Sequence, residues 1–266
     1  MQASPPMPGL EDLGLFDSCV TLGRFSSETC IPTTADLLPI LDRYRIREAL
    51  VHDYHARGIY PLSHGNRRVM DQVSGQPRLH PVWVLEPALA PGAAAAEGIV
   101  AEMLAAGVHA ARLRIRAKGA LPWVWEDLLG ALASHRVPCF LDYGSPESTL
   151  GELSDGDVDA LRTMVLAHPD LPFILSHVMG GLGVHPGVAY LVRRVPNLHI
   201  DITGILEYWR EAARDAGPDR VLFATGMPFT DPGILVSNVQ YARGMTLAEK
   251  RLVCGDTLRA LLGGVR

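Results

Sequence analysis

The stretch Phe173-Ile174-Leu175-Ser176-His177-Val178-Met179-Gly180-Gly181 joins a short apolar run to a histidine and a glycine pair. Apolar runs of this length, bounded by proline or glycine, are typical of strands buried on both faces, and here Pro172 precedes the run. We therefore expect a strand over residues 172–177. Its last residue, His177, leaves the apolar layer at the carboxyl end of the strand, which is where parallel α/β folds bind ligands. The alternative is a buried histidine bonded to a backbone carbonyl.

Short strands alternate with helices along the whole chain. We expect strands at residues 13–20, 48–52, 79–86, 110–116, 137–142, 172–177, 197–203 and 220–225. Helices are expected from Thr33 or Thr34 to Leu41, over 66–73 and 93–106, from Pro122 onward, and over 155–167, 186–194, 205–216 and 231–262.

No two neighbouring strands are joined by a tight hairpin, and such alternation requires a parallel sheet with helices outside it. Eight units over roughly 250 residues are the dimensions of an α/β fold of the (β/α)8 TIM barrel type, as a single domain. An open doubly wound sheet is the alternative, but no G-x-G-x-x-G turn follows the first strand. We assign residues 1–12 to an N-terminal arm and residues 13–266 to the barrel.

Composition limits the partners and the compartment. The formal net charge of −5 and the absence of any Lys/Arg run argue against nucleic acid. No apolar stretch reaches the roughly 18 residues that span a bilayer, so no membrane partner is expected. The proline-rich segment Met1–Leu10 lacks the features of a signal peptide. The four cysteines show no CxxC pair, which indicates reduced thiols in a cytoplasmic protein.

Polar residues gather at the expected strand ends. Arg112 and Arg114 alternate with Ala111, Leu113 and Ile115, so the arginines point into the barrel and need anionic partners. For Arg112 we favour an internal ion pair with Asp142, Glu86 or Asp201. Arg114 lies nearer the mouth, where we favour a carboxylate or phosphate of a substrate.

Four motifs resemble one family, the amidohydrolase-related group of the amidohydrolase superfamily, whose members are metal-dependent TIM-barrel hydrolases and decarboxylases. They are His64-Gly65-Asn66, similar to a Gly-Asn before the second helix; Ile174 to Gly181, similar to an apolar-His-x-Gly-Gly strand end; Leu222 to Phe229, similar to Gly-Ser-Asp-x-Pro; and Cys254 to Leu258, similar to a terminal Gly-Asn-Ala motif with Asp256 in place of asparagine.

The resemblance also implies metal ligands, and most of those positions are substituted. The family's His-x-His on the first strand corresponds to Cys19 and Thr21, its fifth-strand histidine to Asp142, and its eighth-strand aspartate to Gly226. Of the family's metal-binding residues, His177 alone stands at its expected place. Loss of several ligands together favours no metal and no other cofactor. A zinc or manganese site made of Cys19, Asp142 and His177 is the alternative, since thiolate, carboxylate and imidazole all bind such ions.

These residues predict a member of the hydrolase family that acts on or binds a small anionic, carboxylate-bearing molecule without the usual metal centre. His177 and Asp142 form the expected acid/base pair, and Arg114, Arg112, Cys19 and Asp201 the expected substrate contacts. One alternative is an inactive barrel that binds a ligand or a partner protein; the other is a hydrolase with the Cys/Asp/His metal site. Trp123 and Trp125 suit a lid over the mouth or a homo-oligomer contact.

Overall fold

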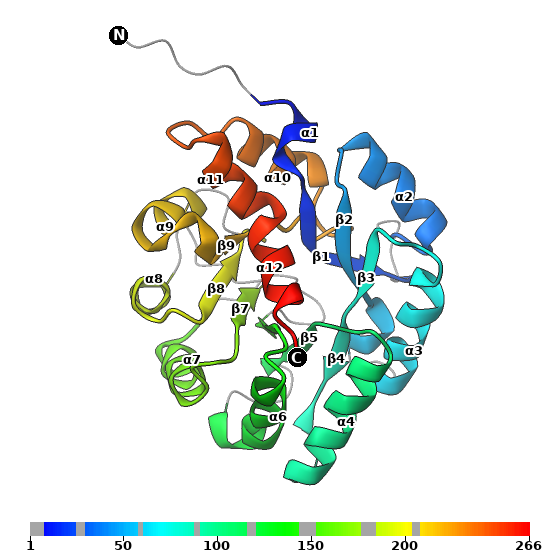
Figure 1. The fold of residues 1–266 in the computed structure, drawn as a ribbon, viewed down its shortest axis with the longest axis vertical. Coiled ribbons are helices and arrows are strands. Elements are labelled where there is room, and N and C mark those ends of the chain that lie inside the picture. Colours follow the sequence, from blue (N-terminus) through cyan, green and yellow to red (C-terminus); the bar gives the residue numbers. More distant parts are fainter. Residues whose placement is uncertain are drawn as a thin grey trace.

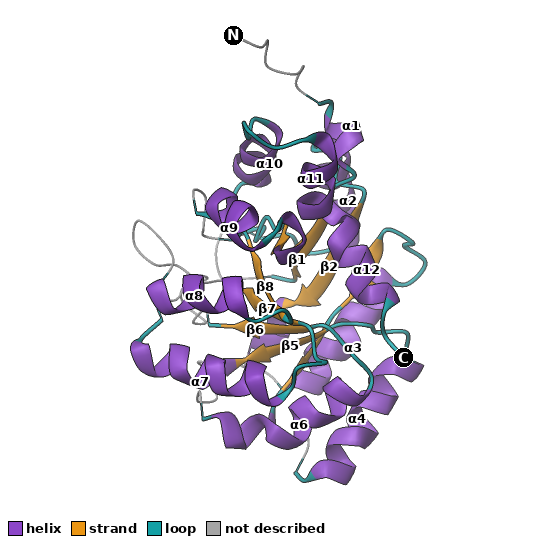
Figure 2. Cartoon of the chain, turned by 60° about the vertical axis from the view of Figure 1, so that its left-hand side comes forward, coloured by secondary structure: helices purple, strands orange, loops and turns teal. Residues whose placement is uncertain are grey.

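The computed structural model describes residues 8–24, 30–57, 61–87, 91–115, 121–143, 153–176, 185–203 and 208–266. In these ranges parallel strands run inside a layer of helices, as Figures 1 and 2 show from two directions. The fold is the predicted single-domain (β/α)8 barrel. Within the described ranges, no helix is both apolar enough and long enough to cross a bilayer.

The strands are short, and neighbours in the chain pair in parallel. Their bounds are β1 Phe16–Leu22, β2 Glu48–Asp53, β3 Leu79–Pro81, β4 Trp83–Leu85, β5 Ala111–Arg114, β6 Cys139–Asp142, β7 Phe173–Ser176, β8 Leu198–Asp201 and β9 Val221–Leu222. They form a ladder β1-β2-β3 and a ladder β4-β5-β6-β7-β8-β9.

Two junctions join these ladders into a ring. Only Val82 separates β3 from β4, and its backbone N–H donates to the carbonyl of Val51 at 2.8 Å. Together β3 and β4 take the place of the third strand predicted over residues 79–86. On the other side, the Ser18 N–H donates to the Phe223 carbonyl and the Thr21 N–H to the Met227 carbonyl, each at 3.0 Å. These backbone bonds connect β1 with the segment around β9.

Helices follow most strands. Their bounds are α1 Leu10–Leu13, α2 Thr34–Arg43, α3 Leu62–Val73, α4 Ala93–Ala105, α6 Pro122–Ser134, α7 Asp155–Ala167, α8 Pro186–Arg194, α9 Trp209–Ala216, α10 Pro232–Gln240, α11 Leu247–Arg251 and α12 Thr257–Gly263. Short helical turns are η1 Tyr54–Arg57, η3 Pro218–Arg220 and η4 Leu252–Asp256. The bounds of α7 and α8 are those predicted. Reciprocal bonds between Ser154 and Asp157 cap the start of α7.

The predicted start of α3 at Asn66 is wrong, because the helix begins at Leu62 and contains the expected Gly-Asn motif. Gly65 packs against η1, where an added Cβ would lie 2.5 Å from the backbone nitrogen of Ala56. The Asn66 side chain exchanges two hydrogen bonds with the backbone of Val84, at 3.0 and 2.9 Å. These two residues therefore fix α3 against η1 and β4.

The interior of the barrel changes from apolar to polar along the strands. Near the strand starts, one cluster contains Phe16, Leu50, Val82, Ala110, Phe140, Ile174, Leu222 and, from α12, Leu258. Side chains two residues further along a strand point to the same face. In β2, β5, β6 and β7 these are the buried residues His52, Arg112, Asp142 and Ser176. The candidate site therefore lies directly above an apolar base.

Close packing of the C-terminal segment against this base can be tested at Gly255. A Cβ added there would lie 2.7 Å from the Gly14 carbonyl oxygen and 3.0 Å from the Phe16 Cβ. We expect Gly255→Ala to lower the free energy of unfolding by about 1–3 kcal/mol in urea denaturation, because the added methyl forces the backbone apart.

Gly98→Ala in α4 is the matched control, since no atom lies within 4 Å of its added Cβ. It should raise the free energy of unfolding by up to about 1 kcal/mol through higher helix propensity. A loss of similar size in both variants would contradict the packing argument.

Candidate functional site

Two buried arginines occupy the inner face of β5. Arg112 is 1% exposed and Arg114 is 4% exposed, while Ala111, Leu113 and Ile115 belong to the hydrophobic core. The predicted alternation is therefore confirmed. Arg114 is the last residue of β5, and it stands opposite Asp142 in the register with β6. The two charged groups thus lie at different depths, Arg112 deeper and Arg114 at the carboxyl end of the strand.

A chain of hydrogen bonds starts at Arg112 and crosses three further strands. Its guanidinium donates to Asp142 Oδ2 at 3.4 Å and to Ser176 Oγ at 3.3 Å. The Ser176 hydroxyl donates in turn to Asp201, whose other oxygen accepts from the backbone N–H of Thr203 at 3.0 Å. All of these side chains are buried. The predicted ion pair between Arg112 and Asp142 is present, and Ser176 links Arg112 to Asp201 through two hydrogen bonds.

Electrostatics keep Arg112 charged in this buried place. Burial disfavours the guanidinium, but the nearby Cys19, Asp142 and Asp201 outweigh that effect and raise its pKa. The guanidinium carbon also lies 5.2 Å from the centre of the Phe140 ring, in the apolar layer below. Arg112 thus connects the apolar base with the carboxylates above it.

Asp17 on β1 is a second buried centre. Thr225 donates its hydroxyl to Asp17 Oδ2 at 2.5 Å and its N–H to Oδ1 at 3.0 Å, and the Cys19 N–H donates to Oδ1 at 3.0 Å. Burial, with a smaller contribution from nearby Asp201, nevertheless raises the pKa of Asp17 to about 7, against the effect of these donors. This carboxyl group joins β1 to the segment after β9.

The two histidines at the end of β2 and in η1 make separate contacts. His52 Nε2 lies 3.1 Å from Thr21 Oγ1, in register across β1 and β2. Asp53 Oδ1 accepts from His55 Nδ1 at 2.8 Å, and Asp53 Oδ2 accepts from Arg68 Nε at 3.2 Å. The turn η1 therefore directs His55 back to Asp53, while His52 faces Thr21.

The predicted site residues have different outcomes. The Arg112 guanidinium bonds to Asp142 and is linked through Ser176 to Asp201, Cys19 influences its pKa, and Arg114 stands opposite Asp142 in the register. His177 lies outside the described residues. The sequence analysis gave no role to Ser176, which bonds to Arg112. Ser176 stands two positions after the inward-facing Ile174, so the alternation of the strand predicts that it also faces inward.

The two tryptophans of α6 do not act together. Trp125 is buried in the hydrophobic core, so the prediction of a lid is wrong for this residue. Trp123 is 72% exposed. Two positions apart on a helix, the side chains point in different directions, and only one can face the barrel.

Comparison with known proteins agrees with this architecture. A family model described as amidohydrolase matches residues 63–264. The chain belongs to the amidohydrolase family. A search of curated proteins found no match.

Solved structures of similar fold include two decarboxylases and a putative hydrolase. 2,6-Dihydroxybenzoate decarboxylase from Rhizobium is 16% identical with a TM-score of 0.69, over 94% of this chain and 98% of that one. 5-Carboxyvanillate decarboxylase from Novosphingobium aromaticivorans, solved with bound manganese, is 12% identical with a TM-score of 0.72, over 94% and 97%. A putative 2-pyrone-4,6-dicarboxylic acid hydrolase from Pseudomonas putida is 20% identical with a TM-score of 0.68, over 95% and 98%.

The described residues do not fit the metal that the family implies. They contain no group of three or more His, Cys, Asp or Glu side chains arranged to hold an ion. Thr21 faces His52, and Asp142 accepts a hydrogen bond from Arg112. Gly226 has a φ of +69°, and a Cβ there would lie 2.8 Å from Thr203 Cγ2. An aspartate therefore cannot replace this glycine without a shift of the backbone or of Thr203.

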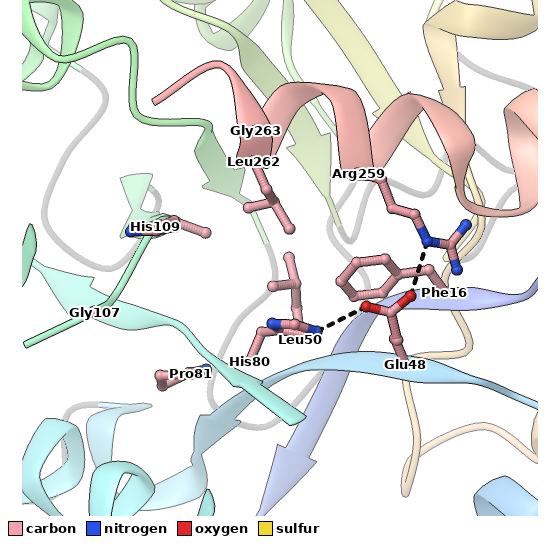
Figure 3. Close-up of a pocket in the computed structure, with 11 residues that line it drawn as sticks. Phe16, Glu48, Leu50, His80, Pro81, Gly107, His109, Arg259, Leu262 and Gly263 are labelled. Carbon is pink, nitrogen blue, oxygen red and sulfur yellow. Dashed lines mark hydrogen bonds and ion pairs between the residues drawn. The ribbon is translucent and has the colours of Figure 1, made fainter. Parts of the chain in front are cut away.

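A cavity of about 260 Å³ lies among the strand starts, at the end of the barrel opposite the candidate site. Figure 3 shows the residues that line it. There Glu48 accepts from Arg259 Nε at 2.8 Å and lies 3.0 Å from His80 Nε2, beside the ring of Phe16. All these strand residues come from strand starts, and α12 covers them. Because barrel enzymes place their chemistry at the carboxyl ends of the strands, we assign this network to stabilisation of the base.

The raised pKa of Asp17 predicts a pH dependence of stability. Its folded value of about 7 lies above the ordinary value of 3.8, so the folded state binds the proton more tightly. This contribution is fully present below about pH 4 and is lost as the pH rises through about 7. Asp17→Asn keeps a neutral side chain throughout. Relative to the wild type, the variant should gain stability between about pH 4 and pH 8, by up to about 4 kcal/mol.

Urea denaturation at a series of pH values measures this difference. Asp159→Asn on the exposed face of α7 shows what the same exchange does at the surface. A constant difference between Asp17→Asn and the wild type over that range would show that Asp17 does not hold its proton in the folded state.

Proposed function

We propose that the protein binds a small cyclic carboxylate at the mouth of its barrel and acts on it as a hydrolase-family enzyme without the family's metal centre. The observation that carries the proposal is the position of Arg114. This arginine stands at the last residue of β5, on the inner face of the barrel and almost fully buried.

An arginine in this position suits recognition of a carboxylate. The planar guanidinium presents paired N–H donors that match the two carboxylate oxygens, and such charge-assisted bonds are strong where water is excluded. Asp142 accepts a hydrogen bond from Arg112, which lies two residues before Arg114 on the same face of β5. Arg114 lies nearer the carboxyl end of β5, so in this proposal it is the arginine that a ligand at the mouth meets first.

The ligands named for similar structures support the same class. Dihydroxybenzoate, carboxyvanillate and pyrone dicarboxylate are each a six-membered ring that carries at least one carboxylate. We extend this class, rather than any one of these molecules, to the present chain. The ring would lie across the mouth while its carboxylate is held by Arg114.

His177 is the proposed proton carrier. It follows Ser176 directly in the sequence, and Ser176 stands opposite Asp142 in the register of β6 and β7. Imidazole exchanges protons near neutral pH, and a neighbouring carboxylate can orient it. In this proposal Arg114 orients the substrate, Asp142 orients the base, and His177 moves the proton.

A non-catalytic carboxylate-binding barrel is the second candidate, and one observation favours it. The eighth-strand position at which the resemblance expects a carboxylate is Gly226, where a side chain would require a shift of the backbone or of Thr203. Turnover measurements decide between the two candidates.

Replacement of Arg114 tests the binding proposal. We expect Arg114→Met to weaken binding of 2,6-dihydroxybenzoate or 2-pyrone-4,6-dicarboxylate by about tenfold or more in isothermal titration calorimetry, since a hydrogen bond to a charged group contributes about 1.5–3 kcal/mol. Arg162→Met, on the exposed face of α7, is the control and should bind as the wild type does. Equal affinity of both variants would remove Arg114 from the site.

Replacement of His177 tests catalysis. Each of the same compounds is incubated with purified protein, and product is followed by chromatography. Turnover that falls by about a hundredfold or more in His177→Asn, with binding retained, supports the enzyme, since a positioned general acid or base contributes about 10²–10⁴ in rate. Turnover that His177→Asn leaves unchanged comes from a contaminant, and binding without turnover supports the non-catalytic barrel.

A further inference from the structure

We infer that Arg112 is the fixed cation around which the mouth is built, in the role that a divalent metal plays elsewhere in the family. The inference deepens the proposed function and rests on its metal-free site. It concerns a positioning residue, because Arg112 acts on the ligand site through Asp142 and Ser176.

The contacts of Arg112 are those of an internal counterion. Its guanidinium reaches Asp142 at 3.4 Å and Ser176 at 3.3 Å, and Ser176 passes the interaction to Asp201. Cys19 on β1 also lies within its electrostatic reach. One positive charge therefore connects buried groups from β6, β7 and β8 through hydrogen bonds.

Two of these groups occupy positions that the resemblance gives to metal ligands. Cys19 stands for a first-strand histidine and Asp142 for the fifth-strand histidine. Asp142 accepts a hydrogen bond from the guanidinium instead, and Cys19 is near enough to influence the pKa of Arg112. One side chain expected to bind a metal thus bonds to an arginine, and the other lies near the same cation.

The described mouth already holds two buried cations. Arg112 and Arg114 supply two positive charges, and the buried Asp142 and Asp201 can supply two negative charges. A divalent ion would add two further positive charges beside two guanidinium groups at low dielectric, where like charges repel strongly. Buried ions need compensating partners, and here the arginine already has them.

This substitution changes what the mouth can do. A metal ion polarises a bound water and lowers its pKa, whereas a guanidinium donates hydrogen bonds from a fixed plane and has no open coordination position. Arg112 therefore holds the carboxylates and hydroxyl in place. Any attack by water has to be assisted by a separate base.

Metal analysis of the full-length, untagged wild-type protein is the first test. After purification without chelators, we expect sub-stoichiometric zinc and manganese by elemental analysis. Added ZnCl₂ or MnCl₂ should leave the thermal unfolding midpoint unchanged. About one equivalent of tightly bound metal in the wild type would overturn the inference.

Removal of the charge is the second test. Arg112→Ala leaves Asp142 and Asp201 without their cation, so its thermal midpoint should fall by on the order of 10 °C. Added ZnCl₂ or MnCl₂ should recover part of this loss. Arg112→Lys keeps a charge and should remain both more stable than Arg112→Ala and insensitive to metal.

Arg220→Ala is the matched control, because Arg220 is also buried but donates to the carbonyls of Val195 and Leu198 rather than to carboxylates. It should lose stability with no recovery on adding metal. An Arg112→Ala protein as stable as the wild type, or one that metal restores no better than Arg220→Ala, would contradict the inference. If Arg112→Ala does not fold, the metal response of Arg112→Lys gives the answer: insensitivity supports the inference and metal-induced stabilisation opposes it.

These outcomes are separate from those of the binding experiment. A wild-type protein that lacks metal but binds no carboxylate leaves Arg112 as the internal cation and removes the proposed function. A wild-type protein that holds metal removes the inference about Arg112, while the comparison of Arg114→Met with Arg162→Met still decides whether carboxylates bind.

Discussion

The ion pair between Arg112 and Asp142 is the constraint on which the mouth of this barrel depends. Moving a guanidinium from water into a protein interior costs several kcal/mol, unless carboxylates and hydroxyls meet it there. Asp142, Ser176 and Asp201 supply those groups from three successive strands. The polar layer and the parallel register of β5 to β8 are therefore coupled, since a shift of one strand by one residue would turn its partner group out of the barrel.

Alternation in the sequence was enough to predict most of this arrangement. The stripe of Arg112 and Arg114 against Ala111, Leu113 and Ile115 correctly placed the arginines inside, and the preference of Arg112 for an internal partner is confirmed. A period-two pattern predicts which side chains share a face of the strand, and the structure has the arginines on the predicted face. The (β/α)8 architecture followed from the same local signals.

Other features depend on contacts between distant segments, which no local pattern encodes. The start of α3 at Leu62 is fixed by Gly65 on η1 and by Asn66 on the backbone of Val84. In β1, the register against β2 shifts between Asp17 and Val20, where the Asp17 carboxylate accepts from the backbone of Cys19. Simple alternation through that strand does not foresee this irregularity. The environment of His177 stays a prediction.

Membership of the family and the chemistry of this chain are separate conclusions. The barrel and its order of elements match the amidohydrolase family. The mouth, however, contains the buried Arg112 and Arg114, and it has Gly226 where the resemblance implies a metal-binding aspartate. One barrel supports many chemistries, so function has to be argued from these side chains. At Gly226 the φ of +69° and the contact with Thr203 both oppose a side chain, so a return to aspartate requires more than the exchange of one residue.

The position of α12 has a consequence for how the chain reaches its native state. Leu258 completes the apolar layer begun by Phe16 and Leu50, and Arg259 bonds to the Gly14 carbonyl and to Glu48. These contacts join segments more than 200 positions apart in sequence, and pairings of such high contact order form slowly. During synthesis, the first strands leave the ribosome long before their cover exists. Their apolar surface is then exposed to other nascent chains, and surface of this kind is prone to aggregation until α12 covers it.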